Sequence, residues 1–308
     1  MPSNQNPLGA LPSRFRRQRI LVVGCGDVGL RVARVLPPRV RVLGLTSSPA
    51  RAPQLRERGI TPLRGNLDEP ATLLRLAGVA DRIVHLAPPS TEPTQHWWRD
   101  RRTQALLRAL RLRSVPAALV YASTTGVYGD CGGDWVPEHR TLAPHTPRAQ
   151  RRVDAERLVR FFGRGSGTRT SVLRIPGIYA NDRVGGTPRE RLEKGTPVLA
   201  AGDDVYTNHI HADDLARAVV AALWRGRPQR AYNTSDESEL KMGDYFDLAA
   251  DLYGLPRQPR VTRSTAQEAL PLVLLSFMSE SRRLVNARMK KELRVRLMHP
   301  TVQSGLRA

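Results

Sequence analysis

Cysteine is nearly absent from this chain of 308 residues, which contains only Cys25 and Cys131. Two cysteines cannot form a disulfide framework or a cysteine-based zinc site, and they suit a reducing compartment, so we expect a cytoplasmic protein. Long apolar runs are also lacking, since the longest, Leu270–Met278, is interrupted by a proline and a serine. A membrane-spanning helix needs about 20 apolar residues, so no membrane association is predicted. Residues 1–18 lack the apolar core of a secretory signal and are predicted to form a disordered leader.

Acidic residues and lysine are scarce as well. The chain has 49 basic and 28 acidic residues and a formal net charge of +21, yet nearly all of the basic residues are arginines. The arginines are spread along the chain, and no basic tract is interleaved with aromatic residues. Dispersed charge supports only sequence-independent attraction to nucleic acid, and a general preference for arginine over lysine gives the same composition. We therefore predict no specific nucleic-acid partner.

What the sequence does contain is a regular alternation of apolar strands and helical patterns from residue 19 onward. Short apolar runs that alternate with helices are typical of buried parallel strands joined by crossover connections. We predict strands at 19–23, 40–45, 60–63, 82–86, 117–121 and 170–175, and helices at 30–36, 52–58, 70–77, 95–113 and 149–162. This order predicts an α/β fold with a doubly wound parallel sheet of the Rossmann type.

Beyond Pro176 the alternation breaks up, and glycine and proline interrupt the chain. Helices are predicted near 215–225, 242–253 and 281–293. We expect a smaller C-terminal lobe over the carboxyl edge of the sheet, where open α/β sheets bind their ligands. The predicted organisation is a leader (1–18), a Rossmann domain (19–175) and a substrate lobe (176–308) from which segments return to the Rossmann domain.

A glycine-rich turn, Gly24-Cys25-Gly26-Asp27-Val28-Gly29, follows the first predicted strand and opens the first predicted helix. In this context Gly24 permits the tight turn, Gly26 lets the backbone approach a diphosphate, and Gly29 lets helix and strand pack closely. The amides of Asp27 and Val28 at the helix N-terminus then face the phosphates, whose charge the helix dipole favours. We therefore expect the Rossmann domain to bind a nicotinamide dinucleotide.

The end of the second predicted strand indicates which dinucleotide binds. NAD-binding folds usually place an acidic residue about 20 residues beyond the glycines, where it binds the ribose hydroxyls. No carboxylate occurs from Val28 to Gln54, and Thr46, Ser47 and Arg51 stand there instead. Hydroxyls and a guanidinium suit the 2′-phosphate of NADP, so we predict NADP as the cofactor. Alternatively, Arg51 is one more solvated arginine, and NAD binds.

Five further motifs occur in order along the chain: Asn66-Leu67-Asp68, His85-Leu86-Ala87, Tyr121-Ala122-Ser123-Thr124-Thr125-Gly126-Val127-Tyr128-Gly129, Leu173-Arg174-Ile175-Pro176-Gly177-Ile178-Tyr179 and His209-Ile210-His211-Ala212-Asp213-Asp214-Leu215. Together they resemble the NAD-dependent epimerase/dehydratase family, the extended branch of the short-chain dehydrogenase/reductase superfamily. The resemblance puts Thr124 at the position of the catalytic Ser/Thr. It also implies cofactor-binding roles for Asn66, Leu67, Leu86, Ala87, Pro88, Ile175 and Pro176.

The chain departs from this family at the proton-transfer pair, Tyr-x-x-x-Lys, which a Glu follows four residues later. Aligning on Glu156 puts Arg152 at the lysine position and Arg148 at the tyrosine position. A guanidinium keeps its proton throughout the accessible pH range, so Arg148 cannot be the acid. Arg152 could still bind the nicotinamide ribose as the lysine does. Because the spacing of the glycines departs as well, the chain resembles the atypical members of the superfamily.

Another group must then carry the proton if the protein is an enzyme. Tyr128 is the candidate nearest to Thr124 in the sequence, followed by Tyr179 and His145. Tyr128 is alternatively a residue that packs in the core or against the cofactor. The predicted function is that of an NADP-dependent oxidoreductase or nucleotide-sugar epimerase/dehydratase-like protein, with catalytic residues Thr124, Tyr128 and Arg152. Its substrate would be a small molecule such as a nucleotide sugar.

Two other functions stay open. The protein could be a non-catalytic NAD(P)-binding sensor or regulatory module, because the Tyr-x-x-x-Lys pair is absent. It could also be a metal hydrolase built on His209, His211 and Asp213, whose spacing can present ligands to zinc. Helix capping by Asp213 explains that spacing more simply, so no metal is predicted.

The substrate pocket is expected to lie at 176–184 and 189–205, where Arg183 holds an anionic group or is a surface arginine. The resemblance also implies a homodimer that forms through the helices at 95–113 and 149–162. Trp97 and Trp98 suit that interface, or else they belong to the core.

Overall fold

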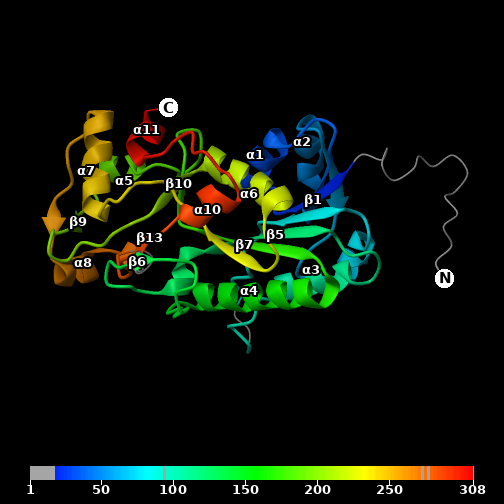
Figure 1. Cartoon of the computed structure of the whole chain (residues 1–308). Helices are drawn as coiled ribbons and strands as arrows, with labels where there is room; N and C mark the ends of the chain where they lie inside the picture. The colour runs from blue at the N-terminus through cyan, green and yellow to red at the C-terminus, as the bar shows by residue number, and fades with distance from the viewer. Residues whose placement is uncertain (1–17, 93–94, 272–273, 276–277, 308) are drawn as a thin grey trace, which may run out of the picture.

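A seven-stranded parallel sheet forms the centre of the computed structural model, which describes residues 18–92, 95–271, 274–275 and 278–307. The predicted leader (1–18) lies almost entirely outside the described residues. The strands lie in the order β3-β2-β1-β4-β5-β7-β11, so the sheet is doubly wound, as predicted (Figure 1). Their bounds are β1 (Arg19–Val23), β2 (Arg41–Thr46), β3 (Ile60–Arg64), β4 (Arg82–His85), β5 (Ala118–Thr124), β7 (Arg169–Ile175) and β11 (Arg230–Asn233).

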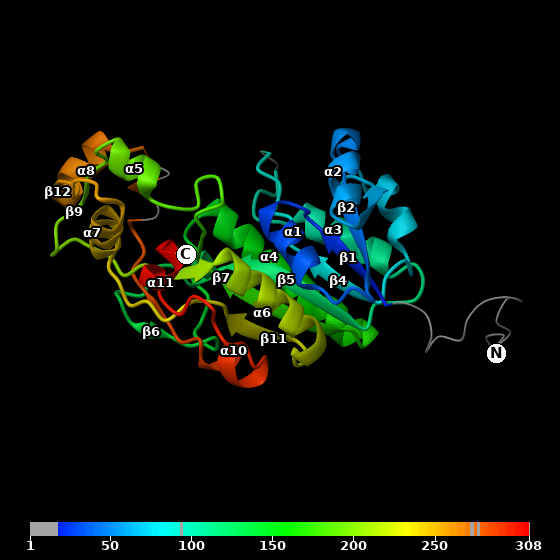
Figure 2. The same ribbon diagram turned by 90° about the horizontal axis from the view of Figure 1, so that it is seen from above.

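Helices cover both faces of this sheet (Figure 2). Alternate strand residues point to opposite faces, so β1 contributes Ile20 and Val22 to one core cluster and Leu21 and Val23 to the other. The first cluster is completed by residues of α1 (Asp27–Val35), α2 (Ala52–Glu57) and α6 (Ala212–Arg225). The second is completed by residues of the 3-10 helix η3 (Pro70–Leu76), α3 (Arg101–Leu110) and α4 (Pro147–Ser166).

A smaller lobe extends beyond the carboxyl edge of the sheet (Figures 1 and 2). A third core cluster, which includes Val198, Phe246 and Ala250, holds this lobe together. Its elements are α5 (Arg189–Glu193), β9 (Val198–Leu199), α7 (Met242–Tyr253), β12 (Arg260–Val261), α8 (Arg263–Ala269) and α11 (Val302–Leu306). Two short parallel pairs lie between the lobe and the sheet, namely β8 (Gly177–Tyr179) with β10 (His209–His211), and β6 (Trp135–Val136) with β13 (Arg283–Leu284).

Several predicted elements differ from the observed ones. Residues 70–76 form a 3-10 helix instead of an α-helix, and α3 begins only at Arg101 because Asp100 caps it by accepting a hydrogen bond from the Thr103 amide. The helix predicted at 281–293 is wrong in its first half, which forms β13, and only α10 (Ala287–Glu292) is helical. The edge strand β11 was not predicted.

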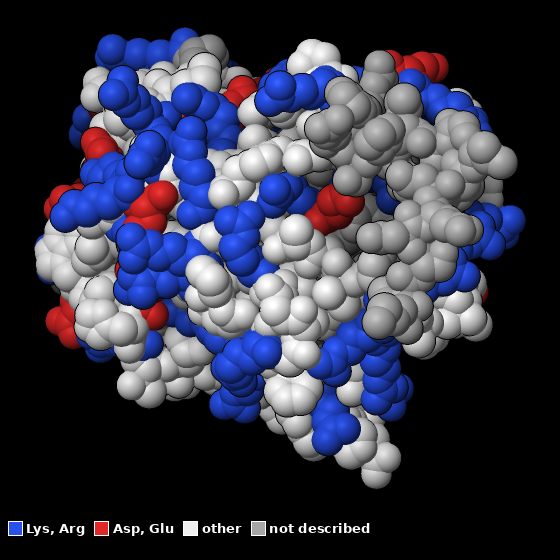
Figure 3. Space-filling view, turned by 45° about the vertical axis from the view of Figure 1, so that its right-hand side comes forward, with Lys and Arg blue, Asp and Glu red and all other residues white. Residues whose placement is uncertain are grey.

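The surface is basic, but its charge is not concentrated in one patch on the face that Figure 3 shows. Figure 3 shows arginine and lysine side chains spread over one face, with few acidic side chains between them. Trp97 and Trp98 are each 42% exposed, so the alternative that they belong to the core is wrong, whereas the dimer stays a prediction. Within the described residues, no helix has the length and apolar character that crossing a membrane requires.

Candidate active site

The glycine turn joins β1 to α1, and two of its glycines are required by close packing. A Cβ atom on Gly24, whose φ is +98°, would lie 2.6 Å from the backbone nitrogen of Ala87, directly after β4. A Cβ atom on Gly29 would lie 2.5 Å from the carbonyl oxygen of Gly24. Both distances are shorter than carbon contacts allow, so side chains at these two positions would push α1 and β4 away from β1.

Gly26 is different, because a Cβ atom there would meet nothing within 4 Å. Its backbone is extended (φ −76°), and it is the N-cap residue of α1 without any side-chain cap. The free space therefore lies directly in front of the helix N-terminus, where the first amides and the dipole favour an anion. This is the geometry that a diphosphate requires, and a side chain would fill the space.

Asp27 puts a carboxylate into the same turn, where basic residues neutralise it. Arg31, one helical turn on, donates to Asp27 Oδ1 at 3.0 Å, and Arg183 of the lobe donates to Oδ2 at 2.9 Å. Arg31 is 6% exposed and also pairs with Asp182 and Asp213. The network therefore ties α1 to the start of α6 and to the loop after β8. Arg183, which was expected to hold an anionic ligand or to be solvated, is paired with Asp27.

The end of β2 reaches the glycine turn through Arg51, whose Nη2 donates to the carbonyl oxygen of Cys25 at 2.6 Å. The described residues give Arg51 no acidic partner, so the rest of its guanidinium stays available beside the turn. The Thr46 hydroxyl closes a local turn by accepting from the Ser48 amide at 3.3 Å. Ser47 is exposed next to it.

Side chains at the ends of β3 and β4 border the same edge of the sheet. Asn66 is held by its neighbours, since its Oδ1 accepts from the Asp68 amide and its Nδ2 donates to Glu69. The amides of Leu86 and Ala87 both donate to the carbonyl oxygen of Val23, which ties β4 to the end of β1. Leu67 and Pro88 lie in the loops that follow the two strands.

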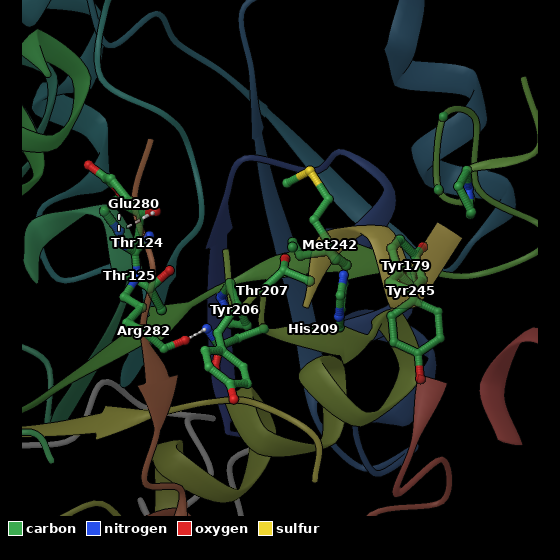
Figure 4. A pocket seen from close by; sticks show the side chains of 18 of the residues that line it. Thr124, Thr125, Tyr179, Tyr206, Thr207, His209, Met242, Tyr245, Glu280 and Arg282 are labelled. Atoms are coloured by element: carbon green, nitrogen blue, oxygen red, sulfur yellow. Dashed lines mark hydrogen bonds and ion pairs between the residues drawn. The ribbon is translucent and has the colours of Figure 1, made fainter. Parts of the chain in front are cut away.

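A cavity of about 710 Å³ opens between the carboxyl ends of β5 and β7 and the lobe. Thr124, the last residue of β5, lines it together with Thr125, and Pro176 lines it next to the buried Ile175. In the view of Figure 4, Glu280 and Arg282 lie at the end that holds Thr124, and Tyr179 and Tyr245 lie at the other end. The cavity therefore brings β5, β7 and the lobe together around Thr124.

The two arginines of α4 differ in their surroundings. Arg152 is 6% exposed, and its Nη1 donates to the Ala122 carbonyl at 2.6 Å and to the Tyr121 hydroxyl at 3.1 Å. Its Nε is buried and has no partner among the described residues. Burial and then the charge of Arg152 lower the pKa of His85 to about 3, so this histidine is neutral. Arg148 lines the cavity and is exposed; partial desolvation and then the charge of Arg152 lower its pKa.

Tyr128 lies in the core and not in the cavity wall. It is 1% exposed, its hydroxyl donates to Asn233 at 2.7 Å, and Arg174 donates to the same oxygen at 2.8 Å. Arg174 also pairs with the fully buried Glu156, whose Oε1 accepts from the Ser123 hydroxyl. Burial alone would raise the pKa of Glu156, but the Arg174 pair lowers it. This geometry favours the packing role for Tyr128 over the catalytic role.

The three residues considered as metal ligands serve separate partners. Asp213 does not cap α6, because His211 is the N-cap residue and accepts from the Asp213 amide at 3.3 Å. The Asp213 carboxylate pairs with Arg31 at 2.7 Å, and the His209 ring packs on Tyr245. The described part of the chain contains no group of three or more His, Cys, Asp or Glu side chains that could hold a metal ion.

The family model of the NAD-dependent epimerase/dehydratase family matches residues 20–235, which include the whole sheet and most of the cavity wall. The chain belongs to this family. Its cofactor class is therefore a nicotinamide dinucleotide. The space before Gly26 and the unpartnered Arg152 Nε fit this cofactor, because they offer a diphosphate cradle and a free donor deeper in the site.

Among known proteins, this family member is similar to dTDP-glucose 4,6-dehydratase of Mycobacterium tuberculosis, with 28% identity over 207 residues. That match covers 59% of this chain and 59% of the dehydratase, and a trifunctional UDP-glucose 4,6-dehydratase of Arabidopsis thaliana is matched over only 24% of its length. A conserved protein of unknown function from Silicibacter pomeroyi is 30% identical, with a TM-score of 0.80 and coverage of 94% and 97% of the two chains. UDP-glucose 4-epimerase of Thermotoga maritima shares the fold, with 19% identity and a TM-score of 0.75.

The structure also contains cavity residues outside the predicted pocket regions. Tyr245 comes from α7 of the lobe, and Glu280 comes from the chain before β13. Arg191 of α5 lies within the predicted pocket region 189–205, although no motif singled it out among the many arginines. His145 and Tyr179 were proton-transfer candidates; only Tyr179 lines the cavity, and burial strongly raises its pKa.

Proposed function

We propose that the protein is an NADP-dependent oxidoreductase or epimerase/dehydratase that acts on a nucleotide sugar. NADP would lie along the carboxyl edge of the sheet, with its diphosphate against Gly26, Asp27 and Val28. Arg51 would bind the 2′-phosphate, since its guanidinium is fixed beside the turn by Cys25 at 2.6 Å and has no acidic partner among the described residues. Hydride chemistry belongs to the nicotinamide, and the protein orients the reacting carbons.

The substrate assignment rests mainly on the surroundings of Arg191. Its Nε and Nη2 are buried without a hydrogen-bond partner in the described structure, and its guanidinium stacks on the Phe246 ring at 4.3 Å. A buried polar nitrogen without a partner costs about 1–3 kcal/mol, so this cation is arranged for an anion that enters the cavity. The diphosphate of a nucleotide sugar supplies such an anion, and a cavity of about 710 Å³ is large enough for the sugar beside it.

Thr124 would polarise the oxygen of the reacting carbon, and Arg152 would bind the nicotinamide ribose through its free Nε. The Thr124 side chain accepts only a weak hydrogen bond from the Gly126 amide at 3.4 Å, so its hydroxyl proton is free to point into the cavity. We do not retain Tyr128 as a catalytic residue. The remaining cofactor contacts that we propose are those of Gly24, Gly29, Thr46, Ser47, Asn66, Leu67, Leu86, Ala87, Pro88, Ile175 and Pro176.

The test has two stages. Fluorescence titration with NADPH and NADH measures cofactor binding, and calorimetric titration of the NADPH-loaded protein with UDP-glucose measures substrate binding. Arg191→Gln should weaken UDP-glucose binding by about 10- to 100-fold, because it removes one charge-assisted contact. Turnover is followed by nicotinamide absorbance and by product analysis, and Thr124→Val should abolish it. Unchanged UDP-glucose affinity in the Arg191→Gln variant would contradict the substrate assignment.

One observation favours a second function, a non-catalytic NAD(P)-binding sensor. Both positions of the proton-transfer pair hold arginines, and Arg148 keeps its proton at any accessible pH. A sensor would bind NADPH but show no turnover with any nucleotide sugar, and Thr124→Val would change nothing beyond stability. The two functions therefore separate at the turnover stage of the same experiment.

A further inference from the structure

Arg148 is a cation without a partner at the reacting end of the cavity. It lies in the first turn of α4 and lines the cavity, and the described residues give its side chain no hydrogen bond and no ion pair. A Cβ atom on Gly126 would lie 3.7 Å from both Ala149 Cβ and Thr124 Cγ2. The first turn of α4 therefore packs beside Thr124, which brings Arg148 to the end of the cavity where the reaction is proposed.

The other charges of the cavity do not neutralise Arg148. Four arginines and one glutamate are among the described residues of its lining. Arg183 is paired with Asp27 at 2.9 Å, and Arg282 is paired with Glu280, the one lining acid, at 2.7 Å. Arg191 is the residue proposed above to bind the nucleotide diphosphate. Arg152, one turn further along α4, adds a second positive charge close to Arg148. Arg148 is exposed at the cavity, so this excess of positive charge attracts an acidic ligand and offers nothing comparable to an uncharged sugar.

We infer that the sugar of the substrate is itself acidic and that Arg148 binds its carboxylate beside Thr124. This inference rests on the proposed function and names the substrate class of the same site. Guanidinium and carboxylate are planar groups that form two parallel charge-assisted hydrogen bonds, which neither a hydroxyl nor a tyrosine at this position provides. Arg148 is thus a specificity-determining residue, and a carboxylate beside the reacting carbon replaces the contact that a tyrosine would make.

The experiment compares two ligands that differ only at C6 of the sugar, where one carries a carboxylate and the other a hydroxymethyl group. NADPH-loaded protein is titrated with UDP-glucuronate and with UDP-glucose by calorimetry. The wild type should bind UDP-glucuronate about 10- to 100-fold more tightly, the ratio expected for one charge-assisted pair. Arg148→Gln should remove this preference, while Arg148→Lys should retain part of it. Arg157→Gln is the matched control, since Arg157 is exposed on the same helix and outside the cavity lining.

The outcomes separate the inference from the proposed function. If both sugars bind with equal affinity and Arg148→Gln changes neither, nucleotide-sugar binding stands and the acidic-sugar inference is overturned. If neither sugar binds to protein that binds NADPH, both are overturned. Thermal unfolding of each variant checks folding; Arg148 has no side-chain bond to lose within the described structure, so Arg148→Gln should unfold at the wild-type temperature.

Discussion

Replacing Gly26 by alanine should separate cofactor binding from stability. The Gly26 backbone (φ −76°) is one that alanine adopts without strain, and its Cβ would meet no atom within 4 Å. Alanine should therefore raise the free energy of unfolding by less than about 1 kcal/mol, because it restricts the unfolded chain more than glycine does. The same methyl group occupies the space proposed for the diphosphate. We expect the Kd for NADPH to rise at least about 10- to 100-fold, or roughly 1.4–2.7 kcal/mol.

Gly29→Ala, in the same turn, should reduce stability. Its Cβ would lie 2.5 Å from the Gly24 carbonyl oxygen, a backbone atom that cannot rotate away. We expect a loss of about 1–3 kcal/mol of unfolding free energy from this overpacking. Gly202→Ala is the neutral control, because Gly202 lies in the lobe and its Cβ would also meet nothing within 4 Å.

Urea unfolding and fluorescence titration with NADPH measure the two properties of each variant. We expect Gly26→Ala to lose binding alone, Gly29→Ala to lose stability, and Gly202→Ala to lose neither. Wild-type NADPH affinity in the Gly26→Ala variant would refute it, since the diphosphate could then not lie against this turn. A large loss of stability in the same variant would refute the claim that the space is free.

Three further predictions concern single side chains. Arg51→Gln should raise the Kd for NADPH about 10-fold in a fluorescence titration and leave that for NADH unchanged, because only NADPH carries the 2′-phosphate. Glu156→Gln leaves Arg174 buried without its partner and should cost about 3–5 kcal/mol by urea unfolding at neutral pH. Because the folded pKa of Glu156 is depressed, this difference should shrink as the pH falls below its ordinary value of 4.5. Burial raises the pKa of Asp236 to about 7, so the unfolding free energy should fall as the pH rises from about 4 to 7, and Asp236→Asn should abolish that slope.

The Rossmann half of the fold could be predicted because its signals are local. Each strand from β1 to β5 is a short apolar run, and β1, β2 and β3 are each followed within a few residues by a helix. The glycine turn needs only six consecutive residues, so the packing roles of Gly24 and Gly29 follow from the strand–turn–helix context. Elements whose conformation depends on contacts with distant parts of the chain could not be predicted from such local signals.

The helix predicted at 281–293 shows where prediction from local sequence fails. Arg283 and Leu284 pair with Trp135 and Val136, about 150 positions earlier, and this pairing overrides the local helical pattern. The edge strand β11, Arg-Ala-Tyr-Asn, has only two apolar residues between polar ends, so its sequence carries too little pattern. In the candidate site, the contact between Arg183 and Asp27 spans 156 positions, and nothing in the sequence of either loop indicates it.

The arginines of α4 separate two properties that the proton-transfer pair of the family combines. A tyrosine at the first position can move a proton, whereas arginines at the two positions can bind an anion or a polar group but hold their protons. Loss of a positioned acid or base costs about 10²–10⁴ in rate, while a second anion contact strengthens substrate binding. A protein built in this way should bind cofactor and substrate with ordinary affinity and turn over slowly unless another cavity group accepts the proton. The kcat of the wild type, and not its Kd for either ligand, is therefore the quantity that distinguishes an enzyme from a sensor here.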